Sequence, residues 1–145
     1  MKKLFLSSDH AGFDAKNTLK DVFEQSFDVC DLGAHTSEKT DYTHYAHILA
    51  KQITSTKDSF GILICGSGVG VSIVANKYPR VRAALIYNEK IAELSRQHND
   101  ANIACFGARF FSLREIQQMA IIFLETTFIG AQHSKRVANI DYKPS

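Results

Sequence analysis

The 145-residue sequence lacks the cysteine patterns of disulfide-bonded and zinc-binding proteins. Its three cysteines, Cys30, Cys65 and Cys105, lie far apart and form no Cys-x-x-Cys pair. An odd number at such spacing argues against both a disulfide framework and a zinc site. His44 and His47 have an i, i+3 spacing that a metal site could use, but solvated helix positions are the simpler explanation. We therefore expect no metal.

Long apolar runs and a strong charge bias are also missing. No apolar stretch approaches the roughly 18 residues of a membrane span, and polar residues 7–10 end the only run that resembles a signal peptide. The formal net charge is +2, basic residues are scattered, and no aromatic-basic motif of an RNA-binding protein occurs. We expect a cytoplasmic protein with no membrane or nucleic-acid partner. The locally basic Lys135-Arg136 pair suits a small anion better.

Strand-like apolar runs alternate with segments of helical period along the chain. Strands are predicted at residues 3–7, 27–32, 60–65, 81–87 and 102–106. Helices are predicted around residues 15–23 and 46–53, from about 69, from 88 to about 98, from 112, and as a short helix within 131–145. Five strands, each followed by a helix, predict a single α/β domain. Its core would be a three-layer, doubly wound, five-stranded parallel sheet of Rossmann-like type.

In such folds, ligands bind beyond the carboxyl ends of the strands. This rule selects Ser8-Asp9-His10, residues 65–70, Asn88-Glu89 and residues 107–109 as the candidate site. The most reactive residue types of the sequence fall in these segments, so function is expected at this edge of the sheet.

A glycine-rich loop, Gly66-Ser67-Gly68-Val69-Gly70, connects the third predicted strand to a helix. Glycines let consecutive backbone N–H groups converge, and the helix dipole adds positive potential, so the loop can bind a phosphate or stabilise an oxyanion. A dinucleotide fingerprint would need a glycine where Val71 stands, and the P-loop lysine is absent. A Rossmann cofactor site, with Glu89 as the ribose-binding acid, is the weaker alternative.

Cys65 comes directly before this loop. The start of a helix favours the thiolate form, which is a competent base or nucleophile. A core cysteine that ends a buried strand explains the same pattern, so both readings stay open at this point. Cys30 and Cys105 lack the loop and are expected to be core residues.

Five segments of the chain occur together in a specific order. They read SDHAG at 8–12, TDY at 40–42, ICGSGVG at 64–70, SRQHNDAN at 95–102 and FGAR at 106–109. In order and spacing they resemble the ribose-5-phosphate isomerase B family, whose broader group includes galactose-6-phosphate and allose-6-phosphate isomerases. The resemblance covers nearly the whole chain. It implies interconversion of D-ribose 5-phosphate and D-ribulose 5-phosphate through an enediolate, without cofactor, in the non-oxidative pentose phosphate pathway.

The resemblance also implies a role for each matching residue. Cys65 would abstract the proton from carbon, because residues 71–73, where some members carry a glutamate, contain no carboxylate. His98 would open the sugar ring, and Ser67 would join the loop amides in holding the oxyanion. Arg109 and Arg136 would clamp the phosphate, since guanidinium binds phosphate oxygens in bidentate fashion. The full set of expected substrate-binding residues is Asp9, His10, Tyr42, Gly66, Ser67, Gly68, Val69, Gly70, Asn99, Arg109, Gln132, His133 and Arg136.

One position departs from the family pattern. Gln132 stands where members often place an arginine that binds phosphate. Glutamine donates hydrogen bonds but carries no charge. Lys135 or His133 could compensate, the phosphate could bind more weakly, or the substrate could differ.

The position of His98 carries a prediction about assembly. It ends the helix after the fourth strand and therefore approaches the start of the fifth, at the sheet edge opposite Cys65. A five-residue strand spans roughly 17 Å, too far for both residues to reach one small sugar within one subunit. We therefore expect a two-fold homodimer, with a tetramer as an option, in which His98 and Asn99 cross from the partner. The tail at 131–145 is expected at the same interface.

Two alternatives to a ribose-5-phosphate isomerase remain from the sequence. One is an allose-6-phosphate or galactose-6-phosphate isomerase of the same family, for which Gln132 leaves room. The other, from a different class, is a flavodoxin-like nucleotide-binding module without catalysis. The incomplete dinucleotide fingerprint argues against that module.

Overall fold

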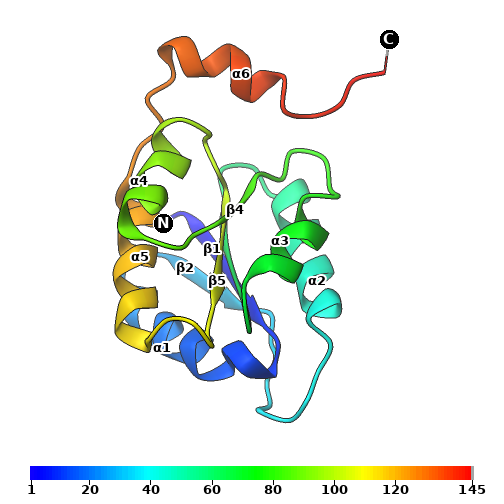
Figure 1. Ribbon diagram of the computed structural model, residues 1–145, viewed down its shortest axis with the longest axis vertical. Coiled ribbons are helices and arrows are strands. Elements are labelled where there is room, and N and C mark those ends of the chain that lie inside the picture. Colours follow the sequence, from blue (N-terminus) through cyan, green and yellow to red (C-terminus); the bar gives the residue numbers. More distant parts are fainter. Residues whose placement is uncertain (145) are drawn as a thin grey trace.

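The sheet is the centre of the fold. A computed structural model of the chain describes residues 1–144, so Ser145, the end of the predicted tail, lies outside the described residues. Five parallel strands have the order β2-β1-β3-β5-β4 (Figure 1). Their bounds are β1 Lys3–Ser8, β2 Asp28–Asp31, β3 Phe60–Cys65, β4 Ala83–Leu85 and β5 Ile103–Gly107. The predicted doubly wound α/β fold is confirmed.

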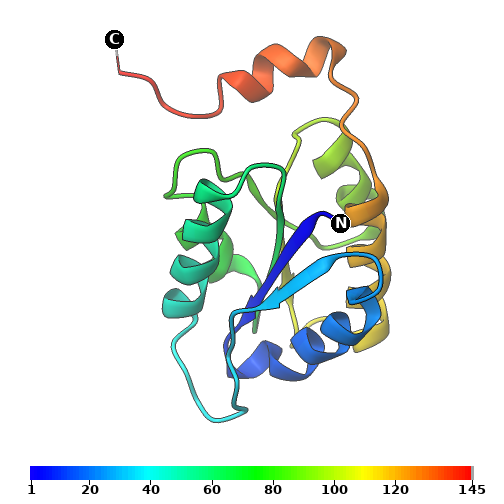
Figure 2. The same cartoon turned by 180° about the vertical axis from the view of Figure 1, so that it is seen from behind.

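Helices cover both faces of this sheet, as Figures 1 and 2 show. One face carries α1 (Phe13–Phe23), α4 (Glu89–Gln97) and α5 (Leu113–Glu125), and the other carries α2 (Tyr42–Ser55) and α3 (Val69–Ala75). Two apolar clusters result, one on each face of the sheet. Parallel strands joined by right-handed crossovers produce this arrangement, because the direction of each crossover decides which face its helix covers.

The remaining helices are short. A 3₁₀ turn, η1 (His10–Gly12), follows β1, and the tail forms η2 (Ala131–His133) and α6 (Ser134–Ala138). The tail crosses one end of the domain, at the top of Figure 2, while the loop between β2 and α2 hangs from the other end. Within residues 1–144, no helix combines the length and apolar character that a bilayer span requires.

The starts of α3, α4 and α5 and the buried third strand were well predicted, whereas α2 begins at Tyr42, four residues before its predicted range. β3 has the predicted bounds, all six of its residues are buried, and α3 begins at the expected Val69. Asn88 caps α4 through its side chain, and Ser112 and Glu115 form a complete capping box at α5. Such caps depend on contacts within one turn of chain, which is why they are visible in the sequence.

The fourth strand is shorter than its prediction, Ala83–Leu85 instead of residues 81–87. It lies at the edge of the sheet, where only β5 pairs with it. On its open side, the Asn76 amide donates to the Ala83 carbonyl and accepts from the Ala83 N–H. These side-chain bonds take the groups that a neighbouring strand would pair with.

Strand order brings three chain segments together. Because β5 lies between β3 and β4, the carboxyl ends of β1, β3 and β5 are neighbours: Ser8 pairs with Ile64, and Cys65 pairs with Gly107. The segments that follow them continue this pairing, since Asp9 N–H donates to the Ile64 carbonyl. The residues after these three strands therefore share one edge of the sheet.

Candidate active site

Cys65 ends β3 and is 4% exposed. Its Sγ accepts a hydrogen bond from the Gly68 N–H at 3.1 Å. Gly68 has φ +81°, and a Cβ there would lie 2.9 Å from the Phe106 carbonyl carbon, so the turn requires glycine. The turn thus aims a backbone donor at the Cys65 sulfur, at the start of α3.

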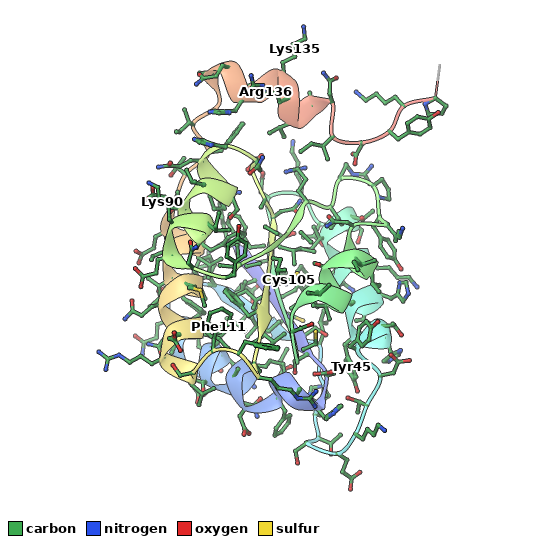
Figure 3. The ribbon with its side chains drawn as sticks, in the orientation of Figure 1. Tyr45, Lys90, Cys105, Phe111, Lys135 and Arg136 are labelled. Atoms are coloured by element: carbon green, nitrogen blue, oxygen red, sulfur yellow. The ribbon has the colours of Figure 1, made fainter. Side chains whose placement is uncertain are left out.

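Cys105 is the contrasting thiol. It lies at the centre of the molecule between the sheet and its helices (Figure 3) and is fully buried. Burial raises the pKa of the Cys105 thiol strongly, and the nearby Cys65 adds to this effect. It therefore stays protonated and serves as a core residue, as predicted. Cys30 is half-buried and packs against the apolar cluster on the α2 and α3 face.

The loop after Cys65 offers backbone donors. Ser67 Oγ accepts the Val69 N–H at 3.2 Å, while the N–H groups of Ser67 and Gly70 have no acceptor within residues 1–144. Gly107 packs against the back of the loop, where a Cβ would lie 2.6 Å from the Ser67 carbonyl oxygen. This contact holds the loop amides in place, so they can receive an oxyanion without reorganising.

Asp9 and His10 follow β1 at the same edge. Asp9 is 6% exposed, and its Oδ1 accepts the Ala11 and Gly12 N–H groups at 3.0 and 3.3 Å. His10 makes a reciprocal pair with Thr40: the His10 N–H donates to Thr40 Oγ1, and the Thr40 N–H donates to His10 Nδ1. Because Nδ1 accepts, the proton of the neutral ring lies on Nε2, which is left as a donor.

Arg109 and Tyr42 complete this edge. The Arg109 N–H donates to the Gly66 carbonyl at 3.0 Å, and a Cβ on Gly66 would lie 3.1 Å from Arg109 Nη1. The Tyr42 ring covers Gly70 more closely, since a Cβ there would lie 2.5 Å from Tyr42 Cε2. An open pocket of about 580 Å³ forms here, lined by Asp9, His10, Lys39, Thr40, Asp41, Tyr42 and Arg109. We call this pocket, together with Cys65 and residues 66–70, the loop half-site.

A second group of predicted residues gathers around His98, which caps the carboxyl end of α4. The His98 and His133 rings stack with centroids 4.2 Å apart and planes 15° from parallel. A pocket of about 240 Å³ is lined by His98, Asn99, His133, Arg136, Val137 and Ile140. We call it the histidine half-site. Desolvation, with the positive charges of His98 and Arg136, lowers the pKa of His133.

Within one chain, the two half-sites lie at opposite ends of the parallel strands: the loop half-site at their carboxyl ends and the histidine half-site at their amino ends. Ile103, which begins β5, pairs with Gly61, and Gly107, which ends it, pairs with Cys65. His98 precedes β5 and so lies near its start, with the tail helix α6 beyond it at the top of Figure 1. The predicted separation of His98 from Cys65 is thus present. Arg109 and Arg136, expected to form one phosphate clamp, fall in different half-sites of a single chain.

Gln132 and Lys135 lie outside the lining of the histidine half-site. Both are exposed, and Figure 3 shows the Lys135 side chain extending away from the body of the molecule. Within one chain, Lys135 therefore brings no charge to this pocket.

The sequence reasoning missed Lys39 and the contact of Thr40 with His10. Thr40 belongs to the TDY segment that carried the resemblance, and Lys39 is its direct neighbour. The adjacency was the available signal. The contact itself joins residues 30 apart, and no local pattern reports a contact of that range.

Comparisons with known proteins agree with this geometry. The model of the family described as Ribose/Galactose Isomerase matches residues 4–140. The ribose-5-phosphate isomerase B of Escherichia coli is 40% identical over 141 residues, covering 97% of this chain and 95% of that protein. A protein of Bacillus subtilis named as a putative sugar phosphate isomerase is 36% identical and covers 97% of each chain.

Solved structures show the same likeness. Ribose-5-phosphate isomerase B of Mycoplasma genitalium, with bound ribulose-5-phosphate, superposes with a TM-score of 0.92 at 37% identity, covering 95% of this chain and 93% of that one. The Thermotoga maritima enzyme has a TM-score of 0.91 at 38% identity, with 97% of each chain covered. The chain belongs to the Ribose/Galactose Isomerase family and is a sugar-phosphate isomerase that interconverts an aldose and a ketose. Its relatives in these comparisons include several enzymes named ribose-5-phosphate isomerase B.

Proposed function

We propose that this isomerase interconverts D-ribose 5-phosphate and D-ribulose 5-phosphate, with Cys65 as the carbon base. The identity of about 40% to a ribose-5-phosphate isomerase B over nearly the full chain supports the substrate. The role of Cys65 rests on one observation: its Sγ accepts a hydrogen bond from the Gly68 N–H, beside a loop whose Ser67 and Gly70 amides have no acceptor within residues 1–144. The family match sets aside a non-catalytic nucleotide-binding module.

The chemistry starts from the open-chain aldose. The Cys65 thiolate takes the proton from C2, the C1–C2 double bond forms, and the carbonyl electrons move to O1. The free Ser67 and Gly70 N–H groups, with the Ser67 hydroxyl, hold this enediolate oxygen. One such donor is worth about 2.7–4 kcal/mol in other enzymes. The thiol returns its proton to C1, C2 becomes the carbonyl carbon, and the O2 proton is passed to O1.

The remaining residues of the loop half-site would position the sugar. Asp9 is nearly buried and negatively charged, which suits sugar hydroxyls and repels phosphate. Arg109 and the Nε2 donor of His10 suit the phosphate instead. The Tyr42 ring over Gly70 walls the pocket and excludes water from the reacting end.

A partner subunit would complete the site. In this proposal, the partner's His98 opens the sugar ring and the partner's Asn99 binds the substrate. The partner's His133 and Arg136 complete the phosphate clamp, with Gln132 nearby as an uncharged donor. The separation of the half-sites within one chain supports this two-fold arrangement, with the tail at the interface. A tetramer would contain two such dimers.

Subunit mixing tests the shared site. Cys65→Ala and His98→Ala proteins should each be inactive, since each lacks one half of every site. After subunit exchange at equal amounts, statistical pairing makes half of the dimers mixed, and each has one intact site, so about a quarter of the sites should recover. No recovery, with exchange verified by mass spectrometry, would contradict the composite site.

An aldohexose-6-phosphate isomerase is the second candidate, because Gln132 replaces a charge that members often carry. A panel of ribose, allose and galactose phosphates, assayed without added metal, distinguishes the two. We expect the highest kcat/KM with ribose 5-phosphate. Inactivity toward all three sugars would overturn the proposed function.

We also propose that the enzyme works in the cytoplasm, in the non-oxidative pentose phosphate pathway. Phosphorylated sugars are charged and do not diffuse across membranes, so an enzyme that consumes them belongs where they are made. Fractionation of cells with an antibody against the chain would test the location.

A further inference from the structure

Lys39 lines the loop half-site on a segment of backbone that is anchored to the site itself. The next residue, Thr40, makes two hydrogen bonds with His10. The His10 N–H donates to Thr40 Oγ1 at 3.0 Å, and the Thr40 N–H donates to His10 Nδ1 at 3.1 Å. Asp41 follows and caps α2 through its bond to the Thr43 N–H. Lys39 therefore projects from a fixed point at the mouth of the pocket, although its side chain is exposed.

The carboxylates that line this pocket are hydrogen-bonded within the chain, whereas its cations form no ion pair within residues 1–144. Asp9 Oδ1 accepts two backbone N–H groups, and Asp41 Oδ1 accepts the N–H and hydroxyl of Thr43. Those Thr43 bonds lower the pKa of Asp41, so the Asp41 carboxylate is already engaged in capping α2. Lys39 and Arg109 take part in no ion pair within residues 1–144. Two uncommitted cations and the His10 Nε2 donor thus face one open space, an arrangement suited to a dianion.

We propose that Lys39 is a further phosphate-binding residue of this isomerase and that its charge offsets the uncharged Gln132. The inference rests on the proposed function, in which the phosphate lies between Arg109 and the partner's histidine half-site. Besides Arg109 and the partner's Arg136, Lys39 would supply a third cation, from the loop half-site. Family members with an arginine at position 132 would instead supply this cation from the tail. An ammonium group at the end of a flexible chain binds phosphate as a point charge and tolerates different geometries.

The alternative source of charge is Lys135. It lies outside the histidine pocket of its own chain and extends away from the molecule (Figure 3). It is carried by the short, exposed helix α6, whereas the backbone next to Lys39 is anchored to a residue of the site. The geometry therefore favours Lys39 over Lys135.

Lys39→Gln in the full-length protein is the direct test. We expect KM for ribose 5-phosphate to rise about threefold to tenfold, the effect of one partly solvated charge pair, with kcat little changed. The inhibition constant of inorganic phosphate should rise by a similar factor. The dependence of KM on salt should become weaker, because one charge no longer contributes. Lys57→Gln is the matched control, since Lys57 is exposed beside the amino end of β3, and it should change none of these values.

A rescue experiment links the two positions. Gln132→Arg introduced into Lys39→Gln should return KM to near the wild-type value, while Lys135→Gln alone should have a smaller effect than Lys39→Gln. An unchanged KM and phosphate inhibition constant in Lys39→Gln, or a larger loss in Lys135→Gln, would overturn the inference.

Direct binding separates this inference from the proposed function. Calorimetry with inorganic phosphate needs no turnover, and wild-type protein should bind it more tightly than Lys39→Gln by the same factor. If the wild type isomerises none of the sugars yet shows this difference, the phosphate site stands and the proposed substrate fails. If the wild type is active and binding is equal in both proteins, the role of Lys39 fails alone.

Discussion

The loop half-site and the histidine half-site are built in different ways. In the loop half-site, Cys65 and Asp9 are almost fully buried at strand ends, and their polar atoms are held by backbone N–H groups. In the histidine half-site, His133 and Arg136 lie on a short, exposed tail segment, and the His133 ring stacks on that of His98. Proton transfer at carbon needs atoms fixed within fractions of an ångström, whereas attraction of a phosphate needs mainly charge.

The space around the glycines differs in the same way between the loop half-site and the tail. A Cβ on Gly68, Gly70 or Gly107 would come within 2.5 to 2.8 Å of a neighbouring atom, while one on Gly130 in the tail would come no closer than 3.3 Å. The packing around the loop leaves no space for a side chain. The reacting part of the site is therefore closely packed against its neighbours, whereas the tail around Gly130 is packed more loosely.

The largest expected effect breaks the loop half-site at its base. Cys65→Ala should lower kcat by about 10²- to 10⁴-fold, the usual contribution of a general base. Cys105→Ala is the matched control, because it removes the other buried thiol, which lies near Cys65 in the neighbouring strand, and should retain kcat while lowering Tm. Steady-state kinetics of both variants decide the matter. A Cys65→Ala enzyme as fast as the wild type would contradict the assigned base.

The second prediction concerns the ion pair at the end of β2, the strand that pairs with β1. Lys16, 1% exposed, binds Asp31 at 2.9 Å, and Asp31 also accepts the Gly33 N–H. Breaking a buried pair costs about 3–5 kcal/mol, so Lys16→Met should lower the free energy of unfolding in urea by that order. Lys3→Met removes the exposed pair with Asp28 and should cost about 0–1 kcal/mol. Equal losses in both variants would show that burial does not matter here.

The same pair predicts an acid dependence. Desolvation raises the pKa of Asp31, but the bonds from Lys16 and Gly33 outweigh it, and the pKa is lowered overall. A lowered folded-state pKa gives stability that is present above the ordinary aspartate value and is lost as pH falls through the lowered one. Lys16→Met should lose this contribution, so its urea midpoint should change less with pH in that range than the wild-type midpoint does.

The third prediction applies one substitution to both halves. Gly68 and Gly130 have φ values of +81° and +74°, so alanine is strained at either position by about 1–3 kcal/mol. At Gly68 the new Cβ also collides with Leu85 and the Phe106 backbone, so the loop must move, and kcat should fall by about tenfold to hundredfold. Gly130→Ala should lower Tm and leave kcat nearly intact. Similar kcat losses in both variants would contradict this difference between the loop and the tail.

The smallest expected effect concerns the charge of the histidine half-site. Desolvation, His98 and Arg136 lower the pKa of His133 in the free protein, and a bound phosphate should raise it again. The cationic His133 ring favours phosphate binding. KM should therefore be lowest at a pH below the His133 pKa of the free protein, and it should rise as the pH increases from that pKa to the higher pKa of the phosphate-bound protein. In His133→Gln, this part of the KM profile should flatten. A wild-type KM that does not change with pH would contradict the link.

Local chemistry explains why much of the site was predictable. Cys65 ends the buried strand β3, the glycine loop follows it, and Arg109 follows β5. Parallel strands present their carboxyl ends on one side of the sheet. Helix caps at Asn88 and Ser112 were visible for the same reason, because their partners lie three residues away. The extent of β4 was overestimated, since the pairing of Ala83 with the Asn76 side chain has no periodic signal.

The sequence by itself determined the strands, the helices and the kinds of chemistry at their ends. Only the tertiary structure decided how these parts meet: that His10 is oriented by Thr40, that Lys39 faces the same pocket as Arg109, and that Arg136 lies in the other half-site. The physical reason is range. Periodicity and capping depend on neighbours within one or two turns, whereas the sheet order and the contacts between distant loops follow from packing of the whole chain.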